Sequence, residues 1–189
     1  MTLILLRHGL TEGNLKHYYC GSADVPLAPE GIADLQKKRA RHHYPTVRHW
    51  YTSGMRRTEE TFAILFGDRP HEVLPDLRET NFGDFEQRAY DGDLEQDAAF
   101  AAWCADSERL PCPNGESTLQ VTARALAALA PILARNEDAL CVTHGGVIGC
   151  LLMHWVPEIP DRYACSPHSG EGFAIEFENG NPISYHAVP

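Results

Sequence analysis

Near its N-terminus the chain reads Leu3-Ile4-Leu5-Leu6-Arg7-His8-Gly9-Leu10-Thr11. Its four consecutive apolar residues, 3–6, predict a strand that is buried on both faces, as in a parallel sheet covered by helices. Arg7, His8 and Gly9 then fall at the carboxyl end of that strand, where open α/β sheets place their ligand sites. The guanidinium of Arg7 suits phosphate or carboxylate, and the ring of His8 offers an unprotonated nitrogen near neutral pH. These three residues alone leave two interpretations open, an anion site or a chance triplet with Arg7 in a surface ion pair.

Strand and helix patterns alternate along the rest of the chain. Helices are predicted over 29–41, 55–66, 117–135 and 147–155, and strands over 47–52, 72–74, 139–143, 173–177 and 183–188. The last two strands form an antiparallel hairpin around residues 179–181. This order predicts an α/β protein with three layers, α/β/α, around a mostly parallel central sheet.

The chain is predicted to be one domain. Its 189 residues suffice for a substantial core, and no repeat, low-complexity segment or linker divides them. A polar stretch at about 84–114 interrupts the alternation of strand and helix. We expect it to be a lid-like insertion within a single domain spanning 1–189.

Composition narrows the class of protein. The formal net charge is -10, which argues against a nucleic-acid-binding surface. No stretch approaches the roughly 18 apolar residues of a membrane span, and the short N-terminal apolar run lacks the basic start of a signal peptide. The six cysteines show no C-x-x-C spacing, which favours a reducing cytoplasm, and the ten histidines show no H-E-x-x-H or H-x-x-E-H metal spacing. The expected partner is a small molecule, with no nucleic acid, membrane, metal or cofactor, and the oligomeric state is left open.

Polar side chains follow three of the predicted strands at the point where each strand ends. They are Arg7, His8, Ser53, Arg57, Thr143, His144 and Gly145. Because the carboxyl ends of parallel strands meet at one edge of a sheet, the two histidines and two arginines converge there. Like charges this close cost free energy unless an anion balances them, so this edge suits a doubly charged phosphate. Arg56, at the same helix start as Arg57, is expected to pair with a surface carboxylate.

The ordered set of motifs resembles the histidine phosphatase superfamily, the group that includes cofactor-dependent phosphoglycerate mutase. The matching residues follow the family's order along nearly the whole chain: Arg7-His8-Gly9 with Thr11 and Asn14; Gly21 with Asp24, Pro26, Leu27 and Gly31; Ser53 with Arg57 and Thr61; 77–79 with 82–86; 115–117 with Arg124; and 143–146. The departures are mild, since Thr58 stands where alanine is common and Gln87 where a glycine usually follows the glutamate. The resemblance implies a phosphoglycerate mutase-like form of the three-layer fold.

The resemblance also assigns roles to residues of this chain. It implies that His8 is the nucleophile and forms a phosphohistidine, and that Glu79 protonates the leaving group and then activates the attacking water. The substrate's phosphoryl group would be bound by Arg7, Asn14, Gly21, Arg57, His144 and Gly145. Arg57 is selected over Arg56 because the family's arginine lies four residues after the serine. Two alternatives stay open for the acid: Glu79 in a salt bridge to Arg78 or a loop lysine, and Glu86 as the competing carboxylate.

Hydrolysis is favoured over mutase chemistry. A mutase must hold a phosphorylated intermediate while the product reorients, which calls for an extra lid and tail, and this chain ends directly after its last predicted strand. The resemblance therefore implies a metal-independent, acid-type phosphatase of a small phosphorylated metabolite. Residues 78–86 and 113–117 are similar to the α-ribazole phosphatase subfamily, which suggests α-ribazole 5'-phosphate.

Selection of the substrate is expected to fall to the insertion at 89–112. Phe100 and Trp103 either stack on a base there or, at their helical spacing, belong to the core. Three alternative functions remain: phosphoglycerate mutase-type phosphoryl transfer, a non-catalytic phosphate-binding module, and a metal-dependent hydrolase that uses the histidines.

Overall fold

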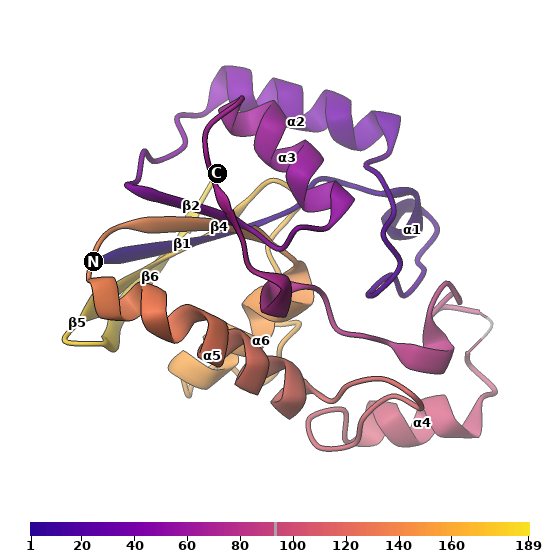
Figure 1. Ribbon diagram of the computed structural model, residues 1–189. Helices are drawn as coiled ribbons and strands as arrows, with labels where there is room; N and C mark the ends of the chain where they lie inside the picture. Colours follow the sequence, from indigo (N-terminus) through magenta and orange to yellow (C-terminus); the bar gives the residue numbers. More distant parts are fainter. Residues whose placement is uncertain (93) are drawn as a thin grey trace.

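The computed structural model describes residues 1–92 and 94–189; residue 93, inside the expected insertion, lies outside the described part. The described residues contain one sheet with the strand order β3-β2-β4-β1-β5-β6 (Figure 1). The strands are β1 Thr2–Arg7, β2 His49–Thr52, β3 Glu72–Val73, β4 Ala139–Thr143, β5 Gly172–Glu178 and β6 Asn181–Val188. Strands β1 to β4 pair in parallel, whereas β5 and β6 pair antiparallel. The mostly parallel sheet and the closing hairpin are both as predicted.

The described helices are α1 Glu12–Leu15, α2 Pro29–Arg41, α3 Arg56–Phe66, α4 Ala98–Ala105, α5 Thr118–Arg135 and α6 Gly145–Trp155, with short 3-10 turns at Pro75–Leu77 and Gly83–Phe85. Helices α2 and α3 cover one face of the sheet, and α5 and α6 cover the other (Figure 1). Leu3 and Leu5 of β1 pack with α5 and α6, whereas Ile4 and Leu6 pack on the other face with α2 and α3. The continuous apolar run therefore reflects burial on both faces, and the three-layer prediction is confirmed. Among the residues described, no helix has the length and apolar character that crossing a membrane requires.

The register of the sheet brings the polar strand ends together. Arg7, the last residue of β1, lies opposite Thr143, the last residue of β4, and the N–H of His8 donates to the carbonyl of Thr143 over 3.0 Å. Strand β2 pairs with the other edge of β4, where the N–H of Ser53 donates to the carbonyl of Val142. Backbone pairing thus produces the convergence that the strand-end pattern predicts.

Helix α6 begins two residues earlier than predicted. It starts at Gly145, with His144 as its N-cap residue, whereas the pattern predicts a helix only from residue 147. Glycine disfavours helix interiors, so the pair Gly145-Gly146 is not recognised as helical from the sequence. As a result, the first N–H groups of α6 lie at the edge where the polar residues gather, and a helix N-terminus favours anions.

The stretch at 84–114 carries helix α4 beyond the carboxyl ends of β1 and β4, on the same side of the molecule as α1 (Figure 1). This stretch packs against the domain through a small, separate apolar cluster that consists of Phe82, Phe85, Leu94, Trp103 and Cys112. Phe100 packs against this cluster, and Trp103 is only 2% exposed. Of the two interpretations offered for these aromatic side chains, the core role is therefore correct for Trp103.

Candidate active site

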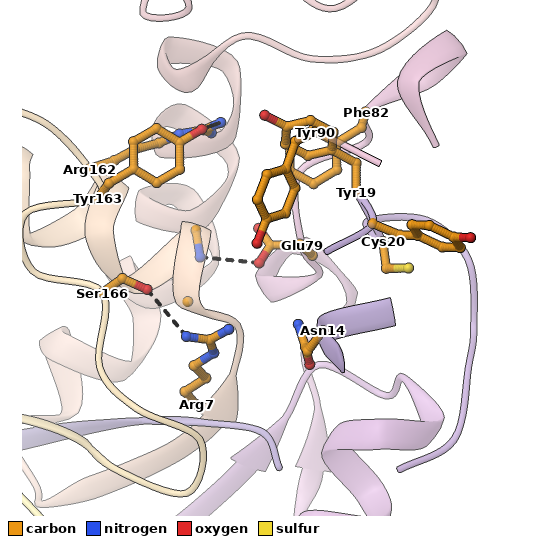
Figure 2. A pocket seen from close by; sticks show the side chains of 13 residues that line it. Arg7, Asn14, Tyr19, Cys20, Glu79, Phe82, Tyr90, Arg162, Tyr163 and Ser166 are labelled. Atoms are coloured by element: carbon orange, nitrogen blue, oxygen red, sulfur yellow. Dashed lines mark hydrogen bonds between the residues drawn. The ribbon is translucent and has the colours of Figure 1, made fainter. Parts of the chain in front are cut away.

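A cavity of about 370 Å³ lies at the carboxyl ends of β1 and β4 (Figure 2). It is lined by Arg7, Asn14, Tyr18, Tyr19, Cys20, Glu79, Phe82, Tyr90, Gly145, Gly146, Arg162, Tyr163 and Ser166. Four of the predicted site residues belong to this wall: Arg7, Asn14, Glu79 and Gly145. The other four, His8, Gly21, Arg57 and His144, are buried and are connected by the contacts described next.

The ring of His8 is buried, with 5% of the residue exposed. Its Nδ1 lies 2.6 Å from the carbonyl oxygen of Gly9. A carbonyl can only accept, so Nδ1 carries the proton and Nε2 keeps its lone pair. Burial, together with the positive charges of Arg57 and Arg7, lowers the pKa of His8 well below its usual value. The ring is therefore neutral at neutral pH and has the electron pair that a nucleophile needs.

The ring of His144 is buried beside that of His8, and both of its nitrogens have partners. The Nε of Arg57 donates to Nδ1 over 3.3 Å, so Nε2 carries the proton and donates to the hydroxyl of Ser53 over 2.9 Å. Burial and then Arg57 lower the pKa of His144 well below its usual value. The hydroxyl of Ser53 lies 3.0 Å from the hydroxyl of Thr58, and the Thr58 hydroxyl donates to the carbonyl of Met55 over 2.7 Å. Thr58, the departure from the family's alanine, thus helps to fix the tautomer of His144.

Arg57, near the start of α3, is buried, and its donors are directed at protein acceptors. Its Nη1 donates to the carbonyl of Ala23 over 2.8 Å and its Nη2 to that of Gly21 over 2.9 Å. Gly21 therefore meets this arginine through its backbone. A Cβ at Gly21 would lie 1.7 Å from the carbonyl oxygen of Thr80, so only glycine allows this close approach. Arg57 thus connects the loop at 20–24 to His144 by hydrogen bonds. A phosphoryl oxygen that binds Arg57 would have to share its N–H donors with these protein acceptors or displace them.

Arg7 lies on the floor of the cavity as Figure 2 shows it, and part of its guanidinium is unpartnered. Its Nη1 donates to the carbonyl of Pro167 over 2.9 Å and to Ser166 Oγ over 3.4 Å. Its Nε is buried with no hydrogen-bond partner in the described part of the chain. An unpaired buried donor costs free energy, whereas a charge-assisted bond to an anion is strong. Arg7 is thus suited to bind an anion in the cavity.

Asn14 is both a helix cap and part of the cavity wall. Its Oδ1 accepts from the N–H and from the hydroxyl of Thr11, each over 3.0 Å, in the capping box that begins α1. Since the oxygen is occupied, the side-chain amide nitrogen remains as a donor on the wall (Figure 2). Asn14 therefore caps α1 and still offers a donor to an anion in the cavity.

Glu79 projects into the cavity between Arg7 and the aromatic side chains (Figure 2). Its Oε2 accepts from the N–H of Gly146 in the first turn of α6 over 3.1 Å, and its Oε1 accepts from the N–H of Thr80 over 2.8 Å. A Cβ at Gly146 would lie 2.3 Å from Oε1. The second glycine of the pair thus makes room for the carboxyl group, a role the sequence analysis does not assign. None of the ion pairs found among the described residues includes Glu79, so it is not held in a salt bridge by Arg78 or by a lysine.

Glu86, the competing carboxylate, is directed at a loop and does not line the cavity. Its oxygens accept from the N–H of Gly21 over 3.1 Å, of Ser22 over 2.8 Å and of Phe82 over 3.0 Å. These bonds hold the loop whose carbonyls bind Arg57. The contacts favour a structural role for Glu86 and leave Glu79 as the carboxyl group open to a ligand.

Part of the cavity wall comes from a segment that the sequence analysis does not consider. Arg162, Tyr163 and Ser166 follow α6 and line the cavity opposite Tyr19 and Tyr90 (Figure 2). No motif marks them. Only their position in the sequence could have indicated that they belong to the site, because they follow the helix whose N-terminus forms it.

Within residues 1–92 and 94–189, no three His, Cys, Asp or Glu side chains lie close enough to hold a metal ion. The donors that gather at the site are instead guanidinium, amide and backbone N–H groups, which suit an anion. Metal independence of the reaction stays a prediction.

The chain is similar to known proteins in both sequence and structure. The model of the histidine phosphatase superfamily, branch 1, matches residues 3–181. The chain is 31% identical over 157 residues to the adenosylcobalamin/alpha-ribazole phosphatase of Escherichia coli K12, covering 80% of this chain and 77% of that protein. It is 33% identical over 159 residues to a probable phosphoglycerate mutase of Proteus mirabilis, covering 80% and 73%. Among solved structures, the alpha-ribazole phosphatase from Shigella flexneri superposes with a TM-score of 0.84 at 26% identity, covering 96% of this chain and 93% of that one.

Proposed function

This chain belongs to the histidine phosphatase superfamily, and we propose that it hydrolyses phosphate monoesters through a phosphohistidine on His8. The observation that carries the proposal is the state of the His8 ring. Its Nδ1 is bonded to the Gly9 carbonyl and its pKa is lowered by burial, so Nε2 has a free lone pair at neutral pH. The guanidinium of Arg7, the residue before His8, lies on the cavity wall and supplies positive charge for an incoming phosphoryl group.

The first step forms a bond from His8 Nε2 to phosphorus and breaks the bond from phosphorus to the ester oxygen. The leaving oxygen takes a proton from Glu79, which lies on the cavity wall between Arg7 and the aromatic side chains. The positive charge that develops on the ring is stabilised at Nδ1–H by the carbonyl of Gly9. In the second step Glu79 takes a proton from water, the water oxygen bonds to phosphorus, and the electron pair of the P–N bond returns to Nε2.

The other predicted residues hold the phosphoryl group or orient those that do. Arg7 and Asn14 bind its oxygens directly from the cavity wall, together with the N–H groups at the start of α6. Arg57 and His144 approach the same group from the buried side, where their mutual bond is long, at 3.3 Å, and can be exchanged for a bond to a phosphoryl oxygen. Gly21 contributes by orienting Arg57.

The substrate we propose is a small phosphorylated metabolite, with α-ribazole 5'-phosphate as the first candidate. Support comes from relatives that carry the name alpha-ribazole phosphatase in both the sequence and the structure comparison. Mutase chemistry is the alternative, because other relatives are named phosphoglycerate mutases. We further propose that 84–114 acts as a lid on a single domain spanning 1–189. Tyr90 of that stretch lines the cavity, which supports this role.

The proposed location is a reducing cytoplasm. All six cysteines, which lie in the described part of the chain, are free. Free thiols persist where glutathione and thioredoxin keep them reduced. The proposed partner is the phosphate ester alone.

The test is a turnover assay with three phosphate esters: α-ribazole 5'-phosphate, p-nitrophenyl phosphate and 3-phosphoglycerate, the last with and without 2,3-bisphosphoglycerate. Release of inorganic phosphate from the first two, abolished in His8→Ala, supports the proposal. Isomerisation of 3-phosphoglycerate without phosphate release would show a mutase instead. Tight binding of phosphate with no turnover of any ester would show a binding module.

A further inference from the structure

The cavity has an aromatic wall whose role the phosphoryl chemistry does not explain. Tyr163 stands on one side, and Tyr19, Phe82 and Tyr90 stand across from it, with Glu79 between these walls and the floor formed by Arg7 (Figure 2). If the phosphoryl group lies at Arg7 and the leaving oxygen at Glu79, the rest of the leaving group extends between the aromatic side chains.

Tyr163 is the most exposed of these residues, at 56%, and Tyr90 is exposed at 45%. Tyr19 and Tyr90 make ring contacts with each other, at a centroid distance of 5.4 Å. In the described part of the chain Tyr163 has no aromatic ring against it, and its ring contact is with the guanidinium of Arg162. One face of a large ring on the cavity wall is thus left for a ligand.

Arg162 fixes the position of this exposed ring. It is 4% exposed, its Nη2 donates to the Tyr163 hydroxyl over 2.8 Å, and its guanidinium carbon lies 4.9 Å from the centre of the Tyr163 ring. Its Nη1 donates to the hydroxyl of Thr80 over 3.2 Å, beside Glu79. The backbone of Arg162 is itself held by α6, because Gly149 packs so closely that a Cβ there would lie 1.9 Å from the Arg162 carbonyl oxygen. An exposed ring held this firmly loses little freedom when a ligand stacks on it.

We propose that Tyr163 is a specificity-determining residue that stacks on a flat aromatic ring in the leaving group of the substrate, and that Arg162 is the positioning residue that holds it. The inference rests on the proposed function, since it needs a leaving group at Glu79. It names the class of substrate as phosphate monoesters whose alcohol carries a planar ring. It also moves substrate selection from the insertion at 89–112 to the segment that follows α6.

The test compares two esters, 2-phenylethyl phosphate and 2-cyclohexylethyl phosphate. Both release a primary alkoxide from the same two-carbon spacer, and their rings are similar in size, but only the first ring is flat. Stacking of aromatic rings adds free energy beyond the burial of area, so the wild-type protein should favour the phenyl ester at least about threefold in kcat/KM. Tyr163→Ala should bring this ratio to about one, acting through KM.

Tyr163→Phe separates the ring from its hydrogen bond. This variant keeps the stacking face but loses the hydrogen bond from Arg162. Its ratio of kcat/KM for the two esters should therefore lie between that of the wild-type protein and that of Tyr163→Ala. Tyr185→Ala, which removes an exposed tyrosine from β6, should leave the ratio unchanged. Thermal melts of each variant identify any that fail to fold.

The outcomes distinguish this inference from the function on which it rests. If the wild-type protein turns over neither ester and releases no phosphate from p-nitrophenyl phosphate, the proposed function itself is wrong. If both esters are hydrolysed without preference, or if Tyr163→Ala keeps the preference, the stacking role is overturned while the phosphatase stands. An equal loss in Tyr163→Phe and Tyr163→Ala would also overturn it, because the ring would then not be the determinant.

Discussion

The rings of His8 and His144 meet edge to face, with their centroids 5.0 Å apart and their planes inclined by 63°. Each ring is neutral because burial lowers its pKa, and each has one tautomer fixed by a partner that can only accept or only donate. Two histidines can therefore lie together beside two arginines without adding further positive charge. The same arrangement leaves Nε2 of His8 free while both nitrogens of His144 are occupied.

The first prediction concerns stability against pH. The pKa of His8 and of His144 is lowered in the folded protein, so below the usual value of 6.5 the unfolded chain binds more protons than the folded one. The contribution of these two histidines to the free energy of unfolding is therefore fully present above pH 6.5. It declines as the pH falls below that value. Each histidine contributes up to about 1.4 kcal/mol per pH unit to this slope.

His8→Asn should lower that slope, because it removes one of the two groups. The measurement is urea unfolding of both proteins at several pH values between 7.5 and 5. Other titrating groups are common to the two proteins and cancel in the comparison. Equal slopes would mean that His8 protonates as readily in the folded protein as in the unfolded chain.

The second prediction compares neighbouring arginines. Arg57→Lys should lower kcat/KM about 10²- to 10³-fold, because lysine cannot reach His144, Gly21 and Ala23 at once. Arg56→Ala is the matched control, since Arg56 forms an exposed pair with Glu60. It should change kcat/KM less than about twofold. Comparable losses in the two variants would contradict the assignment of Arg57.

The third prediction compares two carboxylates. Glu79→Gln should lower kcat about 10²- to 10⁴-fold for alkyl phosphates and much less for p-nitrophenyl phosphate, whose leaving group needs no proton. Glu86→Gln should affect both esters alike, because Glu86 holds the loop at Gly21 and Ser22. Steady-state assays with the two esters give the comparison. If the loss of kcat depended strongly on the leaving group in Glu86→Gln and not in Glu79→Gln, Glu86 would be the proton donor and Glu79 the structural carboxylate.

The fourth prediction tests the glycine beside Glu79. Gly146→Ala would place a Cβ 2.3 Å from Glu79 Oε1, so the carboxyl group must move. The variant should reproduce the leaving-group dependence of Glu79→Gln while remaining folded. Gly92→Ala, where a Cβ has only an ordinary contact 3.9 Å away, is the control and should retain full activity.

The fifth prediction concerns metals. The proposed steps use only side chains and water, so prolonged dialysis against a chelator should leave kcat/KM for p-nitrophenyl phosphate unchanged. Loss of activity that is restored by a divalent cation would point to the metal-dependent alternative.

Much of the fold follows from local pattern. The run at 3–6 is apolar throughout because β1 is covered on both faces, and the polar groups that end β1, β2 and β4 converge because the strands pair in parallel. The local pattern also predicts strand β5 as half of a hairpin. It does not predict that β5 pairs with β1, because a contact between residues 2–6 and 172–176 leaves no local signal.

The site was less completely predicted. The choice of Arg57 over Arg56 came from the family resemblance, since both follow the same strand. Arg162 and Tyr163 were missed because their segment has no periodic pattern and because Arg162 reaches Thr80 across 82 positions of sequence. Gln87, where the family usually has glycine, has a φ of 59°, so this chain keeps the left-handed backbone that a glycine would adopt easily.

The central claim is that His8 accepts the phosphoryl group at Nε2. Rapid alkaline quenching of the protein during turnover of p-nitrophenyl phosphate, followed by peptide mass spectrometry and ³¹P NMR, tests it directly. The account predicts one phosphoryl group on His8, bonded to Nε2, that is stable to alkali, lost in acid and absent from His8→Ala. Turnover without any phosphorylated histidine, or a phosphoryl group on His144, would contradict this claim.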